Sequence, residues 1–166
     1  INSTKGKGII IYFRGGQYEG EWIDNQRNGK GKMTYVDGSV YEGNWKDDTR
    51  HGKGRQRNYN GDEFEGDWVS ENKEGEGVWK SANGERYEGH WSRDKKNGQG
   101  KFFYSNGDRF EGNFHEDRKE GRGTYYFADN SKYEGEYLED LQHGNGREEW
   151  PDGSKFVGKY FKGVKK

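Results

Sequence analysis

The 166-residue chain has no cysteine, a single proline and few aliphatic residues. Without cysteine it can form no disulfide and has no thiolate for catalysis or metal binding. No apolar run approaches the ~18 residues that a membrane-spanning helix requires. Only 26% of the residues are hydrophobic, too few for a thick aliphatic core. These absences leave either a disordered chain or a thin structure that other side chains stabilise.

Aromatic residues and glycine are abundant instead. Aromatic side chains make up 16% of the chain, and there are 29 glycines. Disordered chains contain few aromatic residues, whereas here they recur at fixed spacing. Because aromatic rings bury large areas, we expect them to supply most of the buried surface of a thin, folded structure.

A five-residue motif, aromatic-Glu-Gly-x-aromatic, is repeated along the chain. The clearest copy is Tyr18–Trp22, and the copies begin at residues 18, 41, 64, 87, 110, 133 and 156, always 23 apart. A fixed period of roughly 20–50 residues is the signature of a repeat architecture. We therefore predict one repeat array over residues 1–166, with a half unit at 5–17, six full units at 18–155 and a half unit at 156–166. Since the chain does not begin with Met, it could also be an excerpt of a longer protein.

Two further marks share this period and predict the fold class. One is a Gly-x-Gly, first seen at Gly6 and Gly8, and the other is a turn dipeptide such as Asp37-Gly38. Such dipeptides between strand-like segments are typical of β-hairpins. No helical periodicity is present. We predict an all-β fold: an elongated single-layer antiparallel sheet of stacked 23-residue hairpin repeats, twisted into a ribbon.

The hairpin register depends on the length of this turn. A two-residue loop at Asp37-Gly38 and a three-residue loop at Val36–Gly38 differ by one residue, which exchanges the two faces of one strand. The three-residue loop, with glycine in the left-handed conformation, sets Met33 opposite Tyr41 and gathers aromatic residues and glycines on one face. It also pairs opposite charges on the other face, and we therefore choose it. The expected charge pairs are Lys32–Glu42, Arg55–Glu65, Lys101–Glu111, Lys53–Asp67 and Arg122–Glu136.

The same register gives the glycines a structural role. It sets Gly29 opposite Trp45, and a tryptophan opposite a bare glycine can lie across the neighbouring backbone. The remaining connection, Ile23–Asn28 and its copies, is expected to be a six-residue polar loop at the opposite edge.

The three marks together resemble the MORN repeat family (membrane occupation and recognition nexus), from Gly6 to Gly158. The resemblance implies a chain of β-hairpins that forms one extended antiparallel sheet with an aromatic groove. The family includes junctophilins, a histone methyltransferase, plant phosphatidylinositol phosphate kinases and ciliary radial-spoke head proteins, and in its enzymes catalysis resides in a separate domain. The sequence departs from the pattern where Gln56 and Glu148 replace large residues and Val157 replaces the repeated Glu, and these changes are expected to weaken the groove.

The aromatic face is the candidate site. A single-layer sheet cannot bury both faces, and a continuous aromatic stripe would form a groove for an extended peptide or a helix. The candidate partner-binding residues are Tyr18, Trp22, Tyr41, Trp45, Phe64, Trp68, Tyr87, Trp91, Phe110 and Phe114. Replacing both Trp45 and Trp68 by Ala is expected to abolish partner binding and to leave the strand content largely intact.

Catalysis, metals and cofactors are not expected. Gly-x-Gly leads into a strand and lacks the lysine and the helix of a phosphate-binding loop. The four histidines, His51, His90, His115 and His143, lack the spacing of a metal site. Carboxylates form rows on a wet surface rather than a closed pocket. The net charge of −1 gives no general attraction to nucleic acid. We predict a non-enzyme with no metal and no cofactor.

The preferred function is therefore a structural scaffold that binds other proteins of a large assembly. Similarity to the radial-spoke proteins suggests a cytoplasmic, cytoskeletal location in a cilium or axoneme, by analogy with the family alone.

The alternative is a peripheral membrane module that binds anionic phospholipid headgroups. The acidic middle of the chain disfavours this, and only the basic C-terminal end could contact a lipid or an acidic partner. Its residues are Lys155, Lys159, Lys162, Lys165 and Lys166. Self-association through edge strands is a third possibility, in which the basic ends disfavour end-to-end contact and leave side-by-side pairing open.

Overall fold

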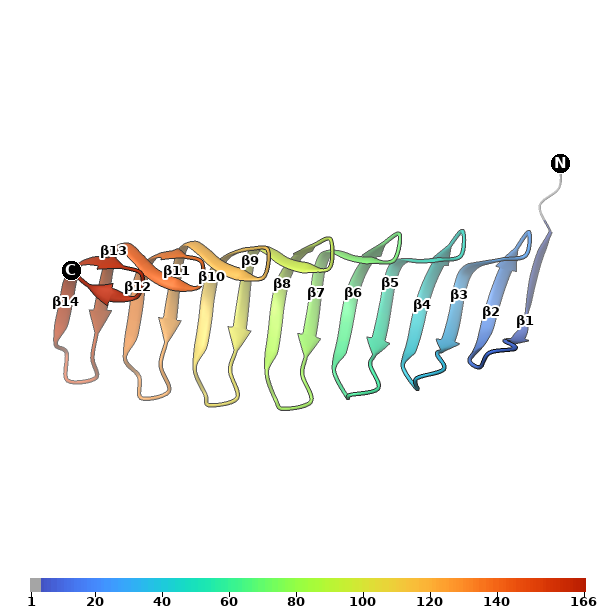
Figure 1. Cartoon of the computed structure of the whole chain (residues 1–166), viewed down its shortest axis with the longest axis horizontal. Coiled ribbons are helices and arrows are strands. Elements are labelled where there is room, and N and C mark those ends of the chain that lie inside the picture. Colours follow the sequence, from blue (N-terminus) through green and yellow to red (C-terminus); the bar gives the residue numbers. More distant parts are fainter. Residues whose placement is uncertain (1–3) are drawn as a thin grey trace. The chain divides into compact units, whose positions relative to one another are not determined.

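The computed structural model describes residues 4–166, and none of these residues is helical. The chain forms two compact units, Ile1–Ala82 and Asn83–Lys166. Within each unit, strands that follow one another in the chain lie side by side and pair antiparallel (Figure 1). The all-β, antiparallel, hairpin-repeat prediction is confirmed. No helix within the described range is long and apolar enough to cross a membrane.

The strands have two regular lengths, seven and nine residues, apart from the last. The first unit contains β1 (Lys5–Ile11), β2 (Gln17–Ile23), β3 (Gln26–Thr34), β4 (Val40–Lys46), β5 (Thr49–Arg57), β6 (Glu63–Val69) and β7 (Asn72–Lys80). The second contains β8 (Arg86–Ser92), β9 (Lys95–Phe103), β10 (Arg109–His115), β11 (Arg118–Tyr126), β12 (Lys132–Leu138), β13 (Leu141–Glu149), β14 (Lys155–Phe161) and the short β15 (Val164–Lys165).

The three-residue loops are confirmed. Around Val36–Gly38, the amide of Tyr35 donates to the carbonyl of Ser39 at 2.8 Å, and the amide of Gly38 donates to the carbonyl of Tyr35 at 3.0 Å. Gly38 has a φ of 93°, the left-handed conformation that glycine adopts without steric cost. Asn130 takes the same place in its repeat at a φ of 71°, as a residue that tolerates this conformation better than most.

The predicted register across these loops is also confirmed. Gly29 lies opposite Trp45 and Met33 lies opposite Tyr41. All five predicted charge pairs lie opposite each other in their strand pairs.

Not every facing charge pair forms an ion pair. Lys53 contacts Asp67, and Lys101 lies 3.8 Å from Glu111. Arg55 forms its ion pair with the diagonal neighbour Glu63, at 3.0 Å, rather than with the facing Glu65. The pattern of opposite charges therefore indicates the register correctly, although a long side chain such as Arg55 can pair with a diagonal neighbour instead.

The predicted six-residue loop at Ile23–Asn28 is wrong. Ile23 pairs with Gln26, so that β2 and β3 are joined by a two-residue turn, Asp24-Asn25, with φ values of 49° and 64°. Two positive φ angles define the turn whose twist suits an antiparallel hairpin. The extra residues are accommodated by a bulge opposite Glu21, where Gly29 has a φ of 92°. The same turn occurs at Asp47-Asp48, Ser70-Glu71, Arg93-Asp94, Glu116-Asp117 and Glu139-Asp140.

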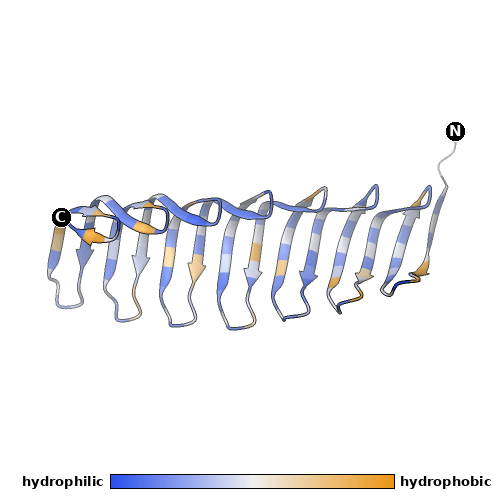
Figure 2. Cartoon of the chain, viewed as in Figure 1, coloured by the Kyte–Doolittle hydropathy of each residue, from blue (hydrophilic) through white to orange (hydrophobic). Residues whose placement is uncertain are grey.

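Hydropathy alone would not reveal a core in either unit. Most of the ribbon is coloured hydrophilic or neutral, and hydrophobic segments are short and separated (Figure 2). Buried side chains are nonetheless present, and all of the large ones are aromatic or Met33. The core therefore consists of rings packed on one face of the sheet.

Candidate functional site

The first residue of each of the first six motifs lies over a glycine of the next strand. Tyr41 is fully buried, and a Cβ added to Gly54 would overlap its ring. Its hydroxyl donates to the carbonyl of Asn44 at 2.8 Å, which satisfies the buried phenol. The equivalent ring–glycine pairs are Tyr18–Gly31, Phe64–Gly77, Tyr87–Gly100, Phe110–Gly123 and Tyr133–Gly146.

The last residue of each motif connects the rings of successive repeats. The indole of Trp45 is edge-to-face with Tyr41 of its own repeat, at 5.1 Å between centroids, and with Tyr18 of the preceding one, at 5.5 Å. Its Nε1 donates to the carbonyl of Gly31 at 3.1 Å. Trp68 makes the same bond to Gly54 at 3.1 Å. The rings within each unit thus form a continuous column.

Cations cover the outer side of this column. In the first unit, the guanidinium groups of Arg27 and Arg50 lie 4.5 Å from the ring centroids of Trp45 and Trp68. In the second unit, Lys96 and Lys119 occupy equivalent positions, and Lys119 has four rings within 5.8 Å of its Nζ. Burial lowers the pKa values of Lys96 and Lys119, which the nearby carboxylates raise in part. Cation–π contact and ring stacking therefore close the face that we expected to be open.

Within each unit the candidate residues lie along one column of rings, but most are not accessible. All of them except Trp22 are buried. The interpretation of the rings as an exposed groove is corrected on this point, because glycines, neighbouring indoles and cations cover them. The expectation that strand content survives loss of both Trp45 and Trp68 is also inconsistent with this packing, since each indole supports two repeats.

One accessible part of the aromatic face lies at the loop ends of β9 and β11. We call Phe102, Tyr104, Tyr125 and Phe127 the aromatic strip. Neighbouring rings are 4.6, 5.5 and 4.7 Å apart, in that order. Phe102 is buried, Tyr104 and Tyr125 are half-buried, and Phe127 is 38% exposed.

Burial and nearby carboxylates keep the two tyrosines of the strip protonated at neutral pH. The hydroxyl of Tyr125 donates to Oδ2 of Asp108 at 2.6 Å. Burial raises the pKa of Tyr104 well above the ordinary value, helped first by the charge of Asp140. Burial also raises the pKa of Tyr125, helped by the hydrogen bond to Asp108. Sequence reasoning did not place these four residues in the site. The signal that could have identified the strip is the period itself, since residues 102 and 125 lie one repeat apart.

The two polar departures from the repeat pattern are bonded internally. Oε1 of Gln56 accepts from Nη1 of Arg50 at 2.7 Å. Oε1 of Glu148 accepts from the hydroxyl of Tyr160 at 2.7 Å. These polar groups replace ring contacts by hydrogen bonds, so both positions remain part of the packed face.

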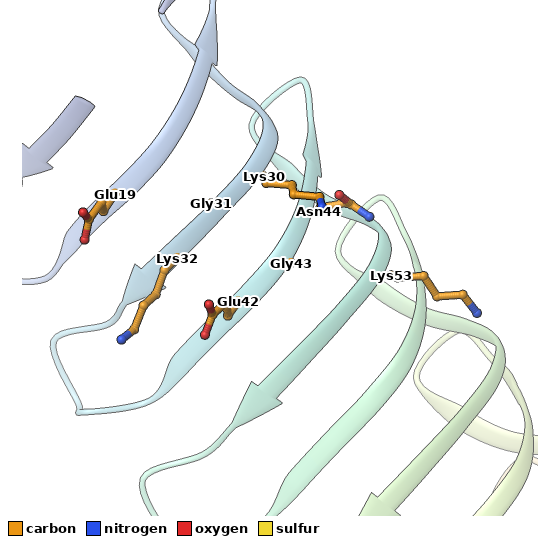
Figure 3. Close-up of a pocket in the computed structure, with 8 residues that line it drawn as sticks. All are labelled: Glu19, Lys30, Gly31, Lys32, Glu42, Gly43, Asn44 and Lys53. Atoms are coloured by element: carbon orange, nitrogen blue, oxygen red, sulfur yellow. The ribbon is translucent and has the colours of Figure 1, made fainter. Parts of the chain in front are cut away.

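The opposite face carries charged side chains around shallow hollows. One hollow of about 550 Å³ lies over β2 to β5, and its long side chains extend outward from the strands (Figure 3). Glu42 and Lys32 are exposed to solvent there. The lining residues are Glu19, Lys30, Gly31, Lys32, Glu42, Gly43, Asn44 and Lys53. General acid–base chemistry needs carboxylates enclosed and brought to one point, and this arrangement instead forms a hydrated charged surface.

Two of the histidines connect consecutive turns. Nδ1 of His51 accepts from the amide of Ser70 at 3.3 Å, and Nδ1 of His143 accepts from the amide of Lys162 at 3.4 Å. Within residues 4–166, no group of His, Asp and Glu side chains has an arrangement that could hold a metal ion.

The five basic residues of the C-terminal end are all exposed. Nζ of Lys165 lies 3.5 Å from Oε1 of Glu148 and 4.9 Å from the ring centroid of Phe156. Phe161 and Val164, which are also exposed, lie between these lysines. This end therefore combines positive charge with apolar surface.

The repeat geometry agrees with the family that the sequence matches. The MORN repeat model matches six consecutive segments, 18–40, 41–63, 64–86, 87–109, 110–132 and 133–155. The chain belongs to the MORN repeat family, as the sequence motifs indicated. A comparison with curated protein sequences gives no significant match.

Solved structures share the fold at low sequence identity. One is the TCP domain of SAS-4 (dCPAP) of Drosophila melanogaster, in complex with a proline-rich motif of Ana2 (dSTIL). It is 14% identical, with a TM-score of 0.57 over 95% of this chain and 90% of that chain. Another, the TCP10c domain of Drosophila melanogaster Sas-4, is 13% identical, with a TM-score of 0.52 over 96% of this chain and all of that one. At this identity the likeness concerns the fold.

Proposed function

We propose that this chain is a non-catalytic scaffold that binds partner proteins along its aromatic face within a cytoskeletal assembly. The observation that carries the proposal is the aromatic strip, in which four neighbouring rings form a partly exposed part of the aromatic face. Half-exposed tyrosines and phenylalanine at the ends of regular strands offer a rigid, amphipathic contact surface.

The ten residues of the column have a supporting role in this proposal. They hold the strands at fixed spacing, so that the strip and the half-buried Trp22 are presented without loss of conformational freedom on binding. The fold is shared with a domain that was solved with a proline-rich motif. Extended proline-rich segments dock on aromatic surfaces, and such a segment is the kind of partner that suits the strip.

Partner capture with matched variants tests the proposal. The chain is immobilised and exposed to cytosol and to detergent-extracted cytoskeleton, and bound proteins are identified by mass spectrometry. We expect stoichiometric cytoskeletal proteins that are lost from the Tyr104→Ser/Phe127→Ser variant. Tyr59→Ser is the control, because Tyr59 is an exposed aromatic residue on a loop of the first unit and is not part of the strip.

Circular dichroism of both variants separates loss of contact from loss of fold. Equal capture by wild type and the strip variant would contradict the proposed surface. Failure of the wild type to retain any cytoskeletal protein would contradict the scaffold function itself.

A ciliary or axonemal location, of the radial-spoke type, is the finer form of this proposal. Its support is the presence of radial-spoke head proteins in the same family. Extracts of isolated axonemes and of cytoplasmic cytoskeleton distinguish the two locations. We expect the stoichiometric partner in the axonemal extract.

Binding to anionic phospholipid is the second candidate function, because the C-terminal end combines five exposed lysines with Phe161 and Val164. Basic residues next to apolar ones are a combination that suits a charged membrane surface. Vesicle flotation tests this candidate. We expect flotation with anionic vesicles that a Lys162→Glu/Lys166→Glu variant loses, and absence of flotation with the wild type would exclude it.

A further inference from the structure

The outer side of β1 lacks the ring that every later repeat has at the same place. Gly8 is equivalent to Gly31 and to the five later glycines over which a motif ring lies. A Cβ added to any of those six would meet ring atoms, whereas a Cβ added to Gly8 or Gly6 would meet nothing within 4 Å. Trp22 is correspondingly half-buried, whereas Trp45 and Trp68 are buried. We call the outer edge of β1, together with Trp22, the head.

Three aliphatic side chains follow the uncovered glycine along β1. Ile9, Ile10 and Ile11 are 58%, 40% and 78% exposed, although the equivalent of Ile10 in the next repeat, Met33, is buried. They lie in the hydrophobic end of β1 (Figure 2). An exposed edge strand with three isoleucines is a strong site for pairing with another strand.

The last long strand, β14, has the complementary feature. Among the described residues, the first ring of the motif is buried against a glycine of the following strand in six of the seven motifs. The seventh, Phe156, has no such glycine and is only half-buried. Val157, 74% exposed, stands where every other motif has Glu. We call β14 the tail. The head thus has a glycine without a ring, and the tail has a ring without a following glycine.

The β2–β3 register, in which Tyr18 faces Met33 and Gly20 faces Gly31, can be applied to these two strands. The residues of β1 precede their equivalents in β3 by one repeat, and the residues of β14 follow their equivalents in β2 by six repeats. The transferred register sets Phe156 opposite Ile10, Val157 opposite Ile9 and Gly158 opposite Gly8.

This register completes the ring–glycine column. The ring of Phe156 would lie over Gly8, and its edge would meet Trp22, as Tyr18 meets Trp45 at 5.5 Å. Val157 and Ile9 would form an apolar pair where the equivalent residues within the chain are Glu19 and Lys32. The match on both faces extends an interface that the chain already contains six times.

We propose that copies of this chain associate head to tail, with β14 of one copy pairing with the outer edge of β1 of the next. This inference concerns a second copy of the chain and does not depend on the aromatic strip. Charge alone led us to disfavour end-to-end contact, because both ends are basic. In the transferred register, however, isoleucine and valine fill the facing positions, and Lys7 and Lys159 are the one like-charged pair on the polar face.

Two features of the tail weaken the proposed contact between β14 and β1, and each suggests a way to strengthen it. Lys159 replaces Glu21, whose carboxylate accepts from the amide of Lys30 at 3.3 Å in the first unit, so salt should strengthen the association by screening the two lysines. The short strand β15 pairs with Tyr160 and Phe161, where Thr4 of the next copy would come. Removing residues 164–166 should therefore also strengthen it.

Sedimentation velocity with two blocked variants tests the proposal. Ile9→Lys blocks the head and keeps a normal tail, and Val157→Lys blocks the tail and keeps a normal head. Both side chains are exposed, so neither change should alter the fold of the monomer. We expect the wild type to form a concentration-dependent series of oligomers, each variant to be monomeric, and an equimolar mixture of the two to stop at a dimer.

The mixture distinguishes head-to-tail from other contacts, because only one compatible pair of ends remains in it. Gly8→Ala is a second head variant, since the added Cβ has free space in the monomer but would meet the ring of Phe156 in the dimer. A wild type that stays monomeric at all concentrations and salt levels would overturn the proposal. Oligomers that persist in the single variants, or a mixture without dimer, would overturn it equally.

Discussion

At the scale of single residues, this protein uses glycine as the partner of an aromatic ring. The rings lie where a side chain of the next strand would otherwise stand, so the hydrogen atom of glycine is required by contact rather than by backbone conformation at Gly54 and its equivalents. Gly8 has the same place in the repeat and no ring. The two positions therefore offer a direct comparison.

Gly54→Ala should lower the free energy of unfolding by about 1–3 kcal/mol, the usual cost of overpacking a closely packed site. Gly8→Ala should leave it unchanged within about 0.5 kcal/mol. Chemical denaturation of both variants, at a concentration where the wild type is monomeric, measures the difference. Equal effects at the two positions would show that ring overlap is not the reason for glycine.

The buried tyrosines predict loss of stability at high pH. Burial raises the pKa values of Tyr18 and Tyr133 from the ordinary 10.0 to about 12, and it raises those of Tyr41 and Tyr137 further. The folded state therefore keeps protons that the unfolded state loses above pH 10. This contribution to stability is fully present below pH 10 and is lost as the pH rises through about 12.

Absorbance at 295 nm and circular dichroism, followed together from pH 9 upward, should show tyrosinate formation coinciding with loss of strand signal. A return to neutral pH should restore both signals. Complete ionisation of the tyrosines with unchanged strand signal would contradict the assignment of Tyr18 and Tyr133 to the core.

At the scale of elements, the tight turns connect each hairpin to the next. The backbone amide of Arg50 donates to Oε1 of Glu71 at 2.7 Å, and its Nε donates to Oε2 at 3.0 Å. The same guanidinium covers Trp68. Glu71 has a φ of 77°, an unfavourable conformation for glutamate that these bonds offset.

Arg50→Ala should cost about 2 kcal/mol, because it removes charged hydrogen bonds and the cation over Trp68. Arg57→Ala is the matched control, since the Arg57 side chain is 68% exposed and its ion pair with Glu63 is long, at 3.9 Å. Thermal unfolding and tryptophan fluorescence of the two variants measure the effect. A loss in Arg50→Ala no greater than in the control would contradict the role of the turn contact.

The elements also show where the sequence was informative. The loop at Val36–Gly38 was predictable because Asp-Gly indicates a turn and opposite charges indicate the register. The turn at Asp24-Asn25 was not, because its left-handed residues are not glycine in any of the six full repeats, and long-range bonds hold them. Burial of Trp45 depends on Gly31, Tyr18 and Arg27 together, so the motif spacing located the aromatic face without showing that it was closed.

At the scale of the whole molecule, one 23-residue repeat should be removable in phase. Deletion of 110–132, a complete repeat, would bring Tyr137 beside Tyr87 in place of Phe114. We expect a folded protein with a lower melting temperature, since one ring–glycine contact is lost and no new kind of interface is created. Deletion of 110–121 removes only part of a repeat, which breaks the 23-residue register, and it should abolish cooperative folding. Equal melting curves for the two deletions would exclude repeat-wise stacking.

Because strand order follows chain order within each unit, tension applied to the ends of a unit would load its strand pairs one after another. Strands would peel from the edge, opening their hydrogen bonds in succession rather than shearing them all together. Each released repeat would add roughly 80 Å of slack, about 3.5 Å for each of its residues. Under load such a unit would lengthen in equal steps at low force and recover when the load falls, which is the behaviour of an extensible tether rather than a rigid strut.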